Sequence, residues 1–243
     1  MDELLLHATF SQATPGSVPL SEGGVHVWAV PLDGDPEPFG QLLSSSEREH
    51  LGRYRFAEHQ RRYQIGHGAL RLILAGYLGS NAADLGFRTG PRGKPYLDHQ
   101  GLFFNLSHSG KLALIGVAKT ELGIDVEKVR HLESLTPIAQ RHFSNAEFAK
   151  LEELSGDARE LAFYRCWTRK EAYIKALGEG LSLPLDSFEV SLGEQPEFLV
   201  CHDGRENPAD WSMLDVSPGP GFVGAVAIRA LDPTVDRFRM ELQ

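Results

Sequence analysis

Leu122-Gly123-Ile124-Asp125-Val126-Glu127 alternates between large apolar residues and other residues. This period of two predicts a β-strand whose apolar side chains face the core. Asp125 and Glu127 then emerge together on the opposite face, about 7 Å apart along the strand. Two carboxylates at this spacing can reach one hard cation. Because an isolated Asp-x-Glu pair is more often a solvated strand face, the interpretation depends on what the rest of the chain brings to this strand.

A helix is predicted over residues 159–177, and it carries a second charged cluster. Trp167, Glu171 and Lys175 are four residues apart and therefore share one helix face. Lys170 is adjacent to Glu171, about 100° round the helix. A surface ion pair between Glu171 and Lys175 is the simplest interpretation, but the tryptophan on the same stripe favours a buried or cleft-facing side. Since carboxylates hold Mg²⁺ beside substrate phosphates and lysines bind phosphate, the two segments predict metal-assisted chemistry on a pyrophosphate.

The rest of the chain supplies helices and strands without regular alternation. Ser44 with Glu47, or Ser46 with Glu49, fits a capping box at the start of a helix. A second capping box, Ser144 with Glu147, predicts another helix from Ser144. The other predicted elements are a helix over 59–78, a turn at 90–95, strands at 102–107 and 111–118, and a small antiparallel meander from residue 187 on. This irregular order favours an α+β fold over a doubly wound sheet.

Composition narrows the class of protein. The 243 residues, 42% of them hydrophobic, suffice for one large domain or two small ones. The net charge of -9 argues against generic nucleic-acid binding. The longest apolar run, 112–118, is far shorter than the roughly 18 residues of a membrane span, and the acidic N-terminus is unlike a signal peptide. The two cysteines are too few for a disulfide framework, which favours a reducing compartment. From these features together, we expect a cytoplasmic protein with no membrane or nucleic-acid partner.

The two charged segments belong to an ordered series of short motifs. The series is Gly93-Lys94-Pro95-Tyr96, Phe104-Asn105-Leu106-Ser107-His108-Ser109-Gly110, the Gly123 strand, Arg141-x-Phe143-Ser144-x-x-Glu147, Trp167-x-x-Lys170-Glu171-Ala172-x-x-Lys175-x-x-Gly178 and Leu181-Ser182-Leu183-Pro184-Leu185-Asp186. Each motif is weak alone. The ordered set, over roughly residues 45–190, resembles the Sfp-type 4′-phosphopantetheinyl transferases, whereas the first 40 residues show no match.

The resemblance implies both a fold and a reaction. The fold has two similar α/β halves in a pseudo-twofold arrangement, residues 1–120 and 121–243, with the active site in the cleft between them. The reaction moves the 4′-phosphopantetheine arm of coenzyme A to a serine of an apo acyl or peptidyl carrier protein and releases adenosine 3′,5′-bisphosphate. It depends on Mg²⁺, with Mn²⁺ as an alternative. The enzyme is expected to be a monomer, because one chain supplies both halves.

The resemblance also assigns roles to individual residues. Asp125, Glu127 and Glu171 match metal ligands, and Glu171, or a water it polarises, matches the base for the carrier serine. Lys170 matches a residue that stabilises the α-phosphate and the departing charge. Lys175 matches a contact to the phosphate or the pantetheine arm. The remaining coenzyme A contacts are Ser107 and His108 for the phosphates, Lys94 and Pro95 on the nucleotide side, Arg62 for the 3′-phosphate, and Arg48. The segment 136–154 matches the site where the family docks the carrier.

Alternatives remain for parts of this interpretation. Arg48, Arg53, Arg55, Arg61, Arg62 and Arg71 form either a solvated helix face or an anchor for a ligand with several negative charges. The whole protein is alternatively a non-catalytic module that binds coenzyme A or a carrier, or a metal-dependent pyrophosphate hydrolase. The module would bind without transfer, and the hydrolase would cleave coenzyme A with no carrier present.

Overall fold

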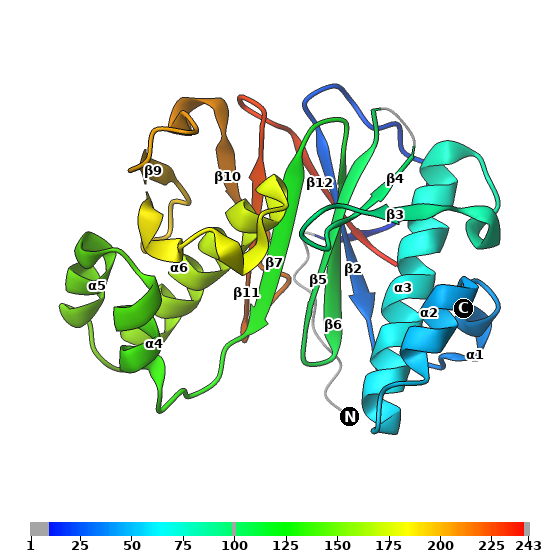
Figure 1. Ribbon diagram of the computed structural model, residues 1–243, viewed down its shortest axis with the longest axis horizontal. Helices are drawn as coiled ribbons and strands as arrows, with labels where there is room; N and C mark the ends of the chain where they lie inside the picture. Colours follow the sequence, from blue (N-terminus) through cyan, green and yellow to red (C-terminus); the bar gives the residue numbers. More distant parts are fainter. Residues whose placement is uncertain (1–9, 99–100, 241–243) are drawn as a thin grey trace.

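The computed structural model describes residues 10–98 and 101–240. The chain forms two halves that lie side by side, each with a β-sheet and a long helix packed against it (Figure 1). This mixture of sheets and helices confirms the expected α+β class.

The first half is built on a five-stranded sheet with the order β1-β12-β2-β6-β5. Its strands are β1 (Ser11–Gln12), β2 (Val25–Pro31), β5 (Phe103–Ser109), β6 (Leu112–Ala118) and β12 (Val235–Arg239), and a separate hairpin joins β3 (Phe87–Thr89) to β4 (Pro95–Leu97). Its helices are α1 (Glu37–Gly40), α2 (Ser45–Leu51), α3 (Ala57–Leu78) and the short 3-10 helix η1 (Ala82–Asp84). Ile65, Ile73 and Leu74 of α3 are buried against this sheet.

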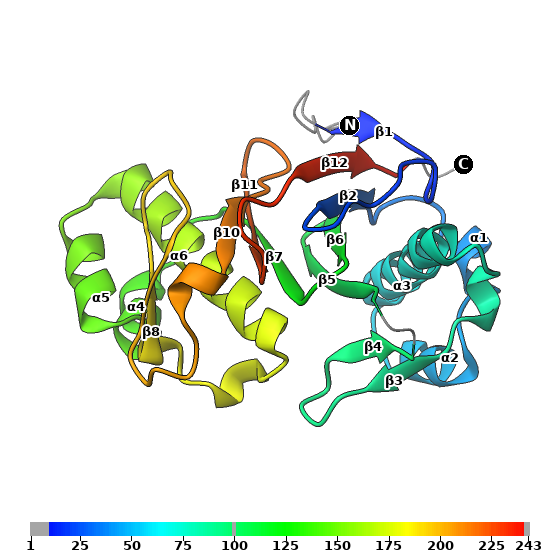
Figure 2. The same cartoon turned by 90° about the horizontal axis from the view of Figure 1, so that it is seen from above.

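The second half is built on a three-stranded antiparallel sheet with the order β10-β11-β7. Its strands are β7 (Leu122–Lys128), β10 (Ser212–Asp215) and β11 (Phe222–Ile228), and β8 (Phe188–Val190) pairs separately with β9 (Phe198–Cys201). Its helices are α4 (Leu135–His142), α5 (Asn145–Glu152) and α6 (Gly156–Leu177), with the 3-10 helices η2 (Gly180–Ser182), η3 (Leu185–Ser187) and η4 (Pro208–Asp210). Viewed from above, α3 and α6 lie on the two flanks, and β5 and β7 meet between them (Figure 2).

The two halves repeat one arrangement. The strand order β2-β6-β5 in the first half matches β7-β11-β10 in the second, and all four of these pairings are antiparallel. Helices α3 and α6 have 22 residues each, and both end at a glycine in the left-handed conformation, Gly79 and Gly178. Capping boxes begin α2 at Ser44 and α5 at Ser144. The expected pair of similar halves is therefore present, although no sequence repeat announces it.

Gly123 determines how closely β7 approaches α6. A Cβ atom at this position would lie 2.1 Å from the carbonyl oxygen of Ala172 and 2.3 Å from the amide nitrogen of Ala176. Only glycine permits this contact of strand and helix backbones. Gly123 thereby allows β7 and α6 to present their carboxylates to the same space.

The last described strand crosses back to the first half. β12 pairs in parallel with β2, with Phe238 opposite Trp28, so it belongs to the first sheet although it lies beyond residue 121. The sequence pattern gave only an antiparallel meander for this region. Parallel pairing with a strand some 210 residues earlier has no local signal, because it depends on long-range packing.

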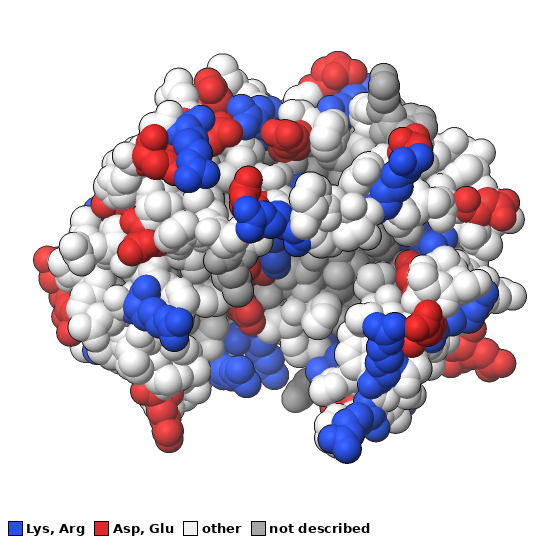
Figure 3. All heavy atoms as spheres, in the orientation of Figure 1, with Lys and Arg blue, Asp and Glu red and all other residues white. Residues whose placement is uncertain are grey.

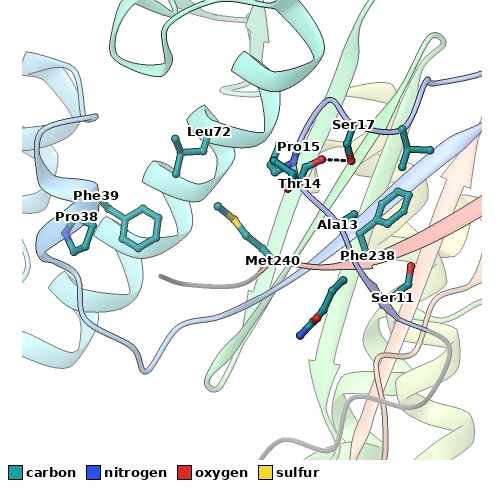
Figure 4. A pocket seen from close by; sticks show the side chains of 12 residues that line it. Ser11, Ala13, Thr14, Pro15, Ser17, Pro38, Phe39, Leu72, Phe238 and Met240 are labelled. Atoms are coloured by element: carbon teal, nitrogen blue, oxygen red, sulfur yellow. Dashed lines mark hydrogen bonds between the residues drawn. The ribbon is translucent and has the colours of Figure 1, made fainter.

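The first half also contains an open pocket of about 630 Å³ between α1, α3 and the segment 11–18 (Figure 4). Phe39, Leu72 and Met240 give it an apolar lining, and none of the predicted site residues lines it. Counted from its first residue, α3 has Leu72 at the position where α6 has Glu171. The equivalent place in the first half therefore lacks a carboxylate like that of Glu171. Among the described residues, no helix has the length and apolarity needed to cross a bilayer.

Candidate active site

Asp125 lies in the middle of β7 and is almost completely buried, with 3% of its surface exposed. Its Oδ1 accepts hydrogen bonds from Lys175 Nζ at 2.6 Å and from Ser107 Oγ at 2.8 Å. Its Oδ2 is buried and has no hydrogen-bond partner in the described part of the chain. Since an unpaired buried carboxylate oxygen costs free energy, the site is arranged to accept a further positive partner at Oδ2.

Glu127 and Glu171 lie in the same acidic environment as Asp125, and we call these three residues the acidic group. Glu127 follows two positions after Asp125, and its Oε2 accepts a hydrogen bond from Ser109 Oγ at 2.7 Å. Burial raises the pKa of Glu127, which the Ser109 hydrogen bond opposes and the charge of Asp125 reinforces. Burial also raises the pKa of Glu171, against the attraction of Lys175 and with further repulsion from Asp125 and Glu127. The strand and the helix therefore bring the three predicted carboxylates into one electrostatic environment.

The metal site predicted from these carboxylates is not assembled in this conformation. Over residues 10–98 and 101–240, no three Asp, Glu, His or Cys side chains are grouped closely enough to hold a metal ion. In this conformation the Lys175 ammonium is paired with Oδ1 of Asp125. The free Oδ2 and the mutual repulsion of the carboxylates nevertheless fit a divalent cation, which prefers such oxygen ligands.

Basic side chains of the first half face this acidic group. Burial lowers the pKa of His108, although part of its side chain is exposed. The positive charges of Lys175, His67 and Arg62 lower this pKa further. Charges from α3 and α6 therefore both act on His108 of β5. Arg62 is held by an ion pair with Glu58 one helical turn earlier. A hollow separates the two halves on this face of the molecule, with Lys and Arg side chains at both sides of its lower end (Figure 3).

Lys170 does not reach this site, which corrects its predicted role. Its side chain is completely buried, and its Nζ forms an ion pair with Glu147 Oε2 at 2.8 Å. It also donates to the carbonyl oxygens of Leu185 and Phe188, each at 2.6 Å. Because Lys170 is about 100° round the helix from Glu171, it points into the core of the second half. Here it fixes α5 and the η3–β8 segment to α6.

Lys94 is also occupied by the protein's own backbone. Its Nζ donates to the carbonyl oxygens of Leu122 at 3.1 Å and Ala176 at 2.8 Å. Burial lowers the pKa of Lys94 to about 8. The residue ties the β3–β4 hairpin to the start of β7 and the end of α6, so the expected nucleotide contact is not preformed. Pro95 begins β4 beside it and is exposed.

The arginines predicted to form one cluster have different surroundings in the structure. Arg71 is buried, forms an ion pair with Glu47 at 2.7 Å, and donates to two backbone carbonyl oxygens. It is therefore structural and does not belong to an anion-binding face. Arg48 donates to the carbonyl oxygen of Leu43, and this local bond does not bring it to the carboxylates. Of the predicted coenzyme A arginines, only Arg62 lies beside the cleft residues.

Trp167 supports the site from one side. Its ring is partly buried, stacks at 6.1 Å on Phe163 and makes an edge contact at 5.8 Å with His142. The latter contact joins the catalytic helix to α4. It therefore links Glu171 physically to the segment 136–154 predicted to dock the carrier.

The comparisons with known proteins agree with this arrangement. The model of the 4'-phosphopantetheinyl transferase superfamily matches residues 121–227, and the model of the 4'-phosphopantetheinyl transferase N-terminal domain matches residues 30–120. The 4'-phosphopantetheinyl transferase HetI of Nostoc sp. is 39% identical over 226 residues, which cover 88% of this chain and 91% of HetI. The chain belongs to the 4′-phosphopantetheinyl transferase superfamily.

Other relatives extend the comparison. The 4'-phosphopantetheinyl transferase Sfp of Bacillus subtilis is 32% identical, over 75% of this chain and 81% of Sfp. The crystal structure of Thermotoga maritima holo-[acyl-carrier-protein] synthase is 21% identical, with a TM-score of 0.35, and the match covers 46% of this chain and 63% of that one. As a 4′-phosphopantetheinyl transferase, the protein modifies carrier proteins and uses coenzyme A as co-substrate.

Sequence reasoning missed several residues that build the site. From the sequence, Glu147 is predicted only as part of a capping box and of the motif that begins at Arg141, whereas its carboxylate also binds Lys170 and accepts from the Val190 amide at 2.8 Å. No sequence pattern singles out His67, whose charge acts on His108. It lies five positions after Arg62 in a helix and belongs to none of the motifs. Asn105 and Ser109 belong to a sequence motif, but the motif does not predict that they contact β7.

Proposed function

We propose that coenzyme A binds across the cleft with its phosphates between the basic residues of the first half and the carboxylates of the second. The observation that carries this is the state of Asp125. It is buried, one oxygen is neutralised by Lys175, and the other has no partner. A charged side chain is held in this way where a further ligand completes its environment.

The positive side chains suit the phosphates of coenzyme A. In this proposal Arg62 binds the 3′-phosphate, and the charges of Arg62 and His67, which both act on His108, support a site for an anion there. Asp125 would hold the divalent cation, and Lys175, which is bonded to Asp125 here, would then be available to a phosphate oxygen. Ser107, whose Oγ lies 3.1 Å from Lys175 Nζ, would be available to a phosphate in the same way.

The transfer itself forms one bond and breaks one. The oxygen of the carrier serine attacks the phosphorus that bears the pantetheine arm, and the bridging bond of the pyrophosphate breaks. Adenosine 3′,5′-bisphosphate leaves with the electron pair. The serine proton goes to Glu171, directly or through a water. Burial raises the pKa of Glu171, which makes it a stronger base than an exposed glutamate.

Asp125, Glu127 and Glu171 would hold Mg²⁺, or Mn²⁺, in the loaded enzyme. The ion supplies charge neutralisation at the pyrophosphate oxygens. The carrier docks on 136–154, where α4 ends in Arg141 and His142 and offers positive charge to an acidic partner. We further propose that the enzyme acts as a cytoplasmic monomer, since both walls of the cleft come from one chain and its two cysteines are free.

The test is a panel of apo acyl and peptidyl carrier proteins incubated with coenzyme A and Mg²⁺. We expect a carrier to gain the mass of one phosphopantetheine group, with stoichiometric release of adenosine 3′,5′-bisphosphate. A single-turnover experiment without carrier is the control. Cleavage of coenzyme A in that control would favour a hydrolase, and binding of both substrates without any mass gain would favour a non-catalytic module.

A further inference from the structure

Strands β5 and β7 lie beside each other although they belong to different sheets. Three side chains of β5, at every second position, replace the backbone pairing that a neighbouring strand would provide. Asn105 Oδ1 accepts from the Ile124 amide at 2.9 Å, Ser107 Oγ from the Val126 amide at 3.4 Å, and Ser109 Oγ from the Lys128 amide at 3.0 Å. We call these three residues the β5 ladder.

The two serines of the β5 ladder make the same pair of contacts. Each hydroxyl oxygen accepts a hydrogen bond from one β7 amide, and each hydroxyl group donates a hydrogen bond to the carboxylate one position earlier on β7. Ser107 donates to Asp125 at 2.8 Å, and Ser109 donates to Glu127 at 2.7 Å. A hydroxyl group suits this position because it donates and accepts at once.

This repeated contact selects one oxygen of each carboxylate. Ser107 is bonded to Oδ1 of Asp125, which leaves Oδ2 without a partner, and Ser109 is bonded to Oε2 of Glu127. Hydrogen bonds from outside the ligand set fix the orientation of metal-binding carboxylates in proteins. The first half of the chain therefore orients the carboxylates of the second half.

We propose that Ser109 is a positioning residue, which holds the Glu127 carboxylate in the orientation that binds the divalent cation. Ser107 has the same geometry toward Asp125 but also contacts Lys175, so Ser109 is the separable member of the pair. The proposal rests on the proposed metal-dependent function. It assigns Ser109 no contact with substrate.

The test measures Mn²⁺ binding by calorimetry, with coenzyme A present and no carrier protein. Ser109→Ala removes the bond to Glu127 and leaves the Lys128 amide, which is near solvent, to water. We expect the dissociation constant for Mn²⁺ to rise about tenfold or more, as for a lost hydrogen bond to a charged group. Ser109→Thr keeps the hydroxyl and should bind Mn²⁺ like the wild type.

Two controls separate positioning from a general effect on the fold. Ser212 lies on β10, and Ser212→Ala removes its 2.7 Å hydrogen bond to the Ala230 carbonyl and should leave Mn²⁺ binding unchanged. In a Glu127→Gln background, Ser109→Ala should weaken Mn²⁺ binding no further, because both changes act on one interaction. Thermal unfolding of each variant verifies that it is folded.

The outcomes distinguish this inference from the proposed function. Wild-type affinity in Ser109→Ala, equal loss in Ser109→Thr, or no Mn²⁺ binding by the wild type would overturn the positioning role. If Mn²⁺ binding depends on Ser109 but no carrier is modified, the proposed transfer fails and the positioning role stands.

Discussion

Arg71 and Lys170 hold the same position in the two halves of the chain. Each is the fifteenth residue of its 22-residue helix, α3 (Ala57–Leu78) or α6 (Gly156–Leu177). Each is buried and forms an ion pair with the glutamate of a capping box, Arg71 with Glu47 and Lys170 with Glu147. The correspondence indicates that both cations are part of the repeated framework, which fastens a short helix to a long one.

Two of the proposed catalytic side chains, Glu171 and Lys175, in contrast, have no charged counterparts at the matching positions of α3. One position after Arg71, α3 carries Leu72 where α6 carries Glu171. Four positions further, Gly76 replaces Lys175, and a Cβ there would lie 2.5 Å from the backbone of Pro15. At these two helix positions the second half carries Glu171 and Lys175, whereas the first half carries uncharged residues, so the repeated framework supports one candidate active site.

Lys170→Met should chiefly reduce stability. Breaking a buried ion pair leaves Glu147 uncompensated and costs about 3–5 kcal/mol of unfolding free energy. The kcat of the remaining folded enzyme should stay close to wild type, because Lys170 does not face the cleft. Urea denaturation and transfer kinetics below the unfolding transition measure the two effects. Arg71→Met is the matched control in the first half. A Lys170 variant that is as stable as wild type but inactive would restore the phosphate contact that the sequence suggested.

The environment of Lys170 could not be predicted from the sequence. Helical spacing places Glu171 and Lys175 on one face, and the structure agrees. The same spacing places Lys170 on another face, but it does not say what covers that face. The partner, Glu147, comes from a different helix and is brought there by tertiary packing. Lys94 is a similar case, since its two carbonyl acceptors belong to β7 and α6.

Local signals, by comparison, were reliable. The alternation at 122–127 predicted β7, and the serine-glutamate pairs at Ser44 and Ser144 predicted the starts of α2 and α5. These features depend on hydrogen bonds between residues a few positions apart. The β5 ladder and the return of β12 depend on strands distant in sequence, so no local pattern announces them.

Glu47 should make the fold sensitive to acid. Burial alone would raise the pKa of Glu47, but hydrogen bonds from His67, Arg71 and Ser44 outweigh it and lower the pKa to about 2. The ordinary value is 4.5, so the stabilisation is fully present above that pH and is lost as pH falls toward 2. Lowering the pKa of Glu47 from 4.5 to about 2 corresponds to about 3 kcal/mol of stability.

Urea denaturation at pH 6 and pH 3 measures this contribution. Glu47→Gln should be less stable at pH 6 and should lose less stability on acidification, because its side chain does not titrate. Glu49→Gln changes an exposed carboxylate on the same helix, paired with Arg53, and should behave like wild type. An unchanged pH slope in Glu47→Gln would show that other carboxylates dominate acid unfolding.

Asp125→Asn should abolish transfer while the fold persists. The substitution keeps the shape but removes the charge at the centre of the acidic group, and we expect kcat to fall at least about 100-fold. Lys175 loses its ion pair, and because its side chain is partly exposed the loss of stability should be about 1 kcal/mol. Transfer at limiting Mg²⁺ and thermal unfolding provide the measurements. Asp236→Asn, on β12 beside His26, serves as a control. Normal turnover by Asp125→Asn would remove this residue from the metal set.

Arg62→Ala should weaken the binding of coenzyme A through its 3′-phosphate. A charge-assisted hydrogen bond to phosphate contributes roughly 1.5–3 kcal/mol, so KM should rise about 10- to 150-fold. The contact is distant from the reacting phosphorus, so kcat should change less. Arg53→Ala is a close match, because Arg53 also forms an ion pair with a glutamate four residues earlier, Glu49. It should leave KM unchanged.

The decisive comparison uses 3′-dephospho-coenzyme A, which lacks the group that Arg62 is expected to bind. Wild type should use this substrate poorly, and Arg62→Ala should use it about as well as wild type does. The two defects should not add, because both remove one interaction. If Arg62→Ala instead impairs both substrates by the same factor, the arginine does not read the 3′-phosphate. Its bond to Glu58 would then serve to hold the first turns of α3, and the loss of activity would follow from displacement of His67 and His108 on the cleft wall.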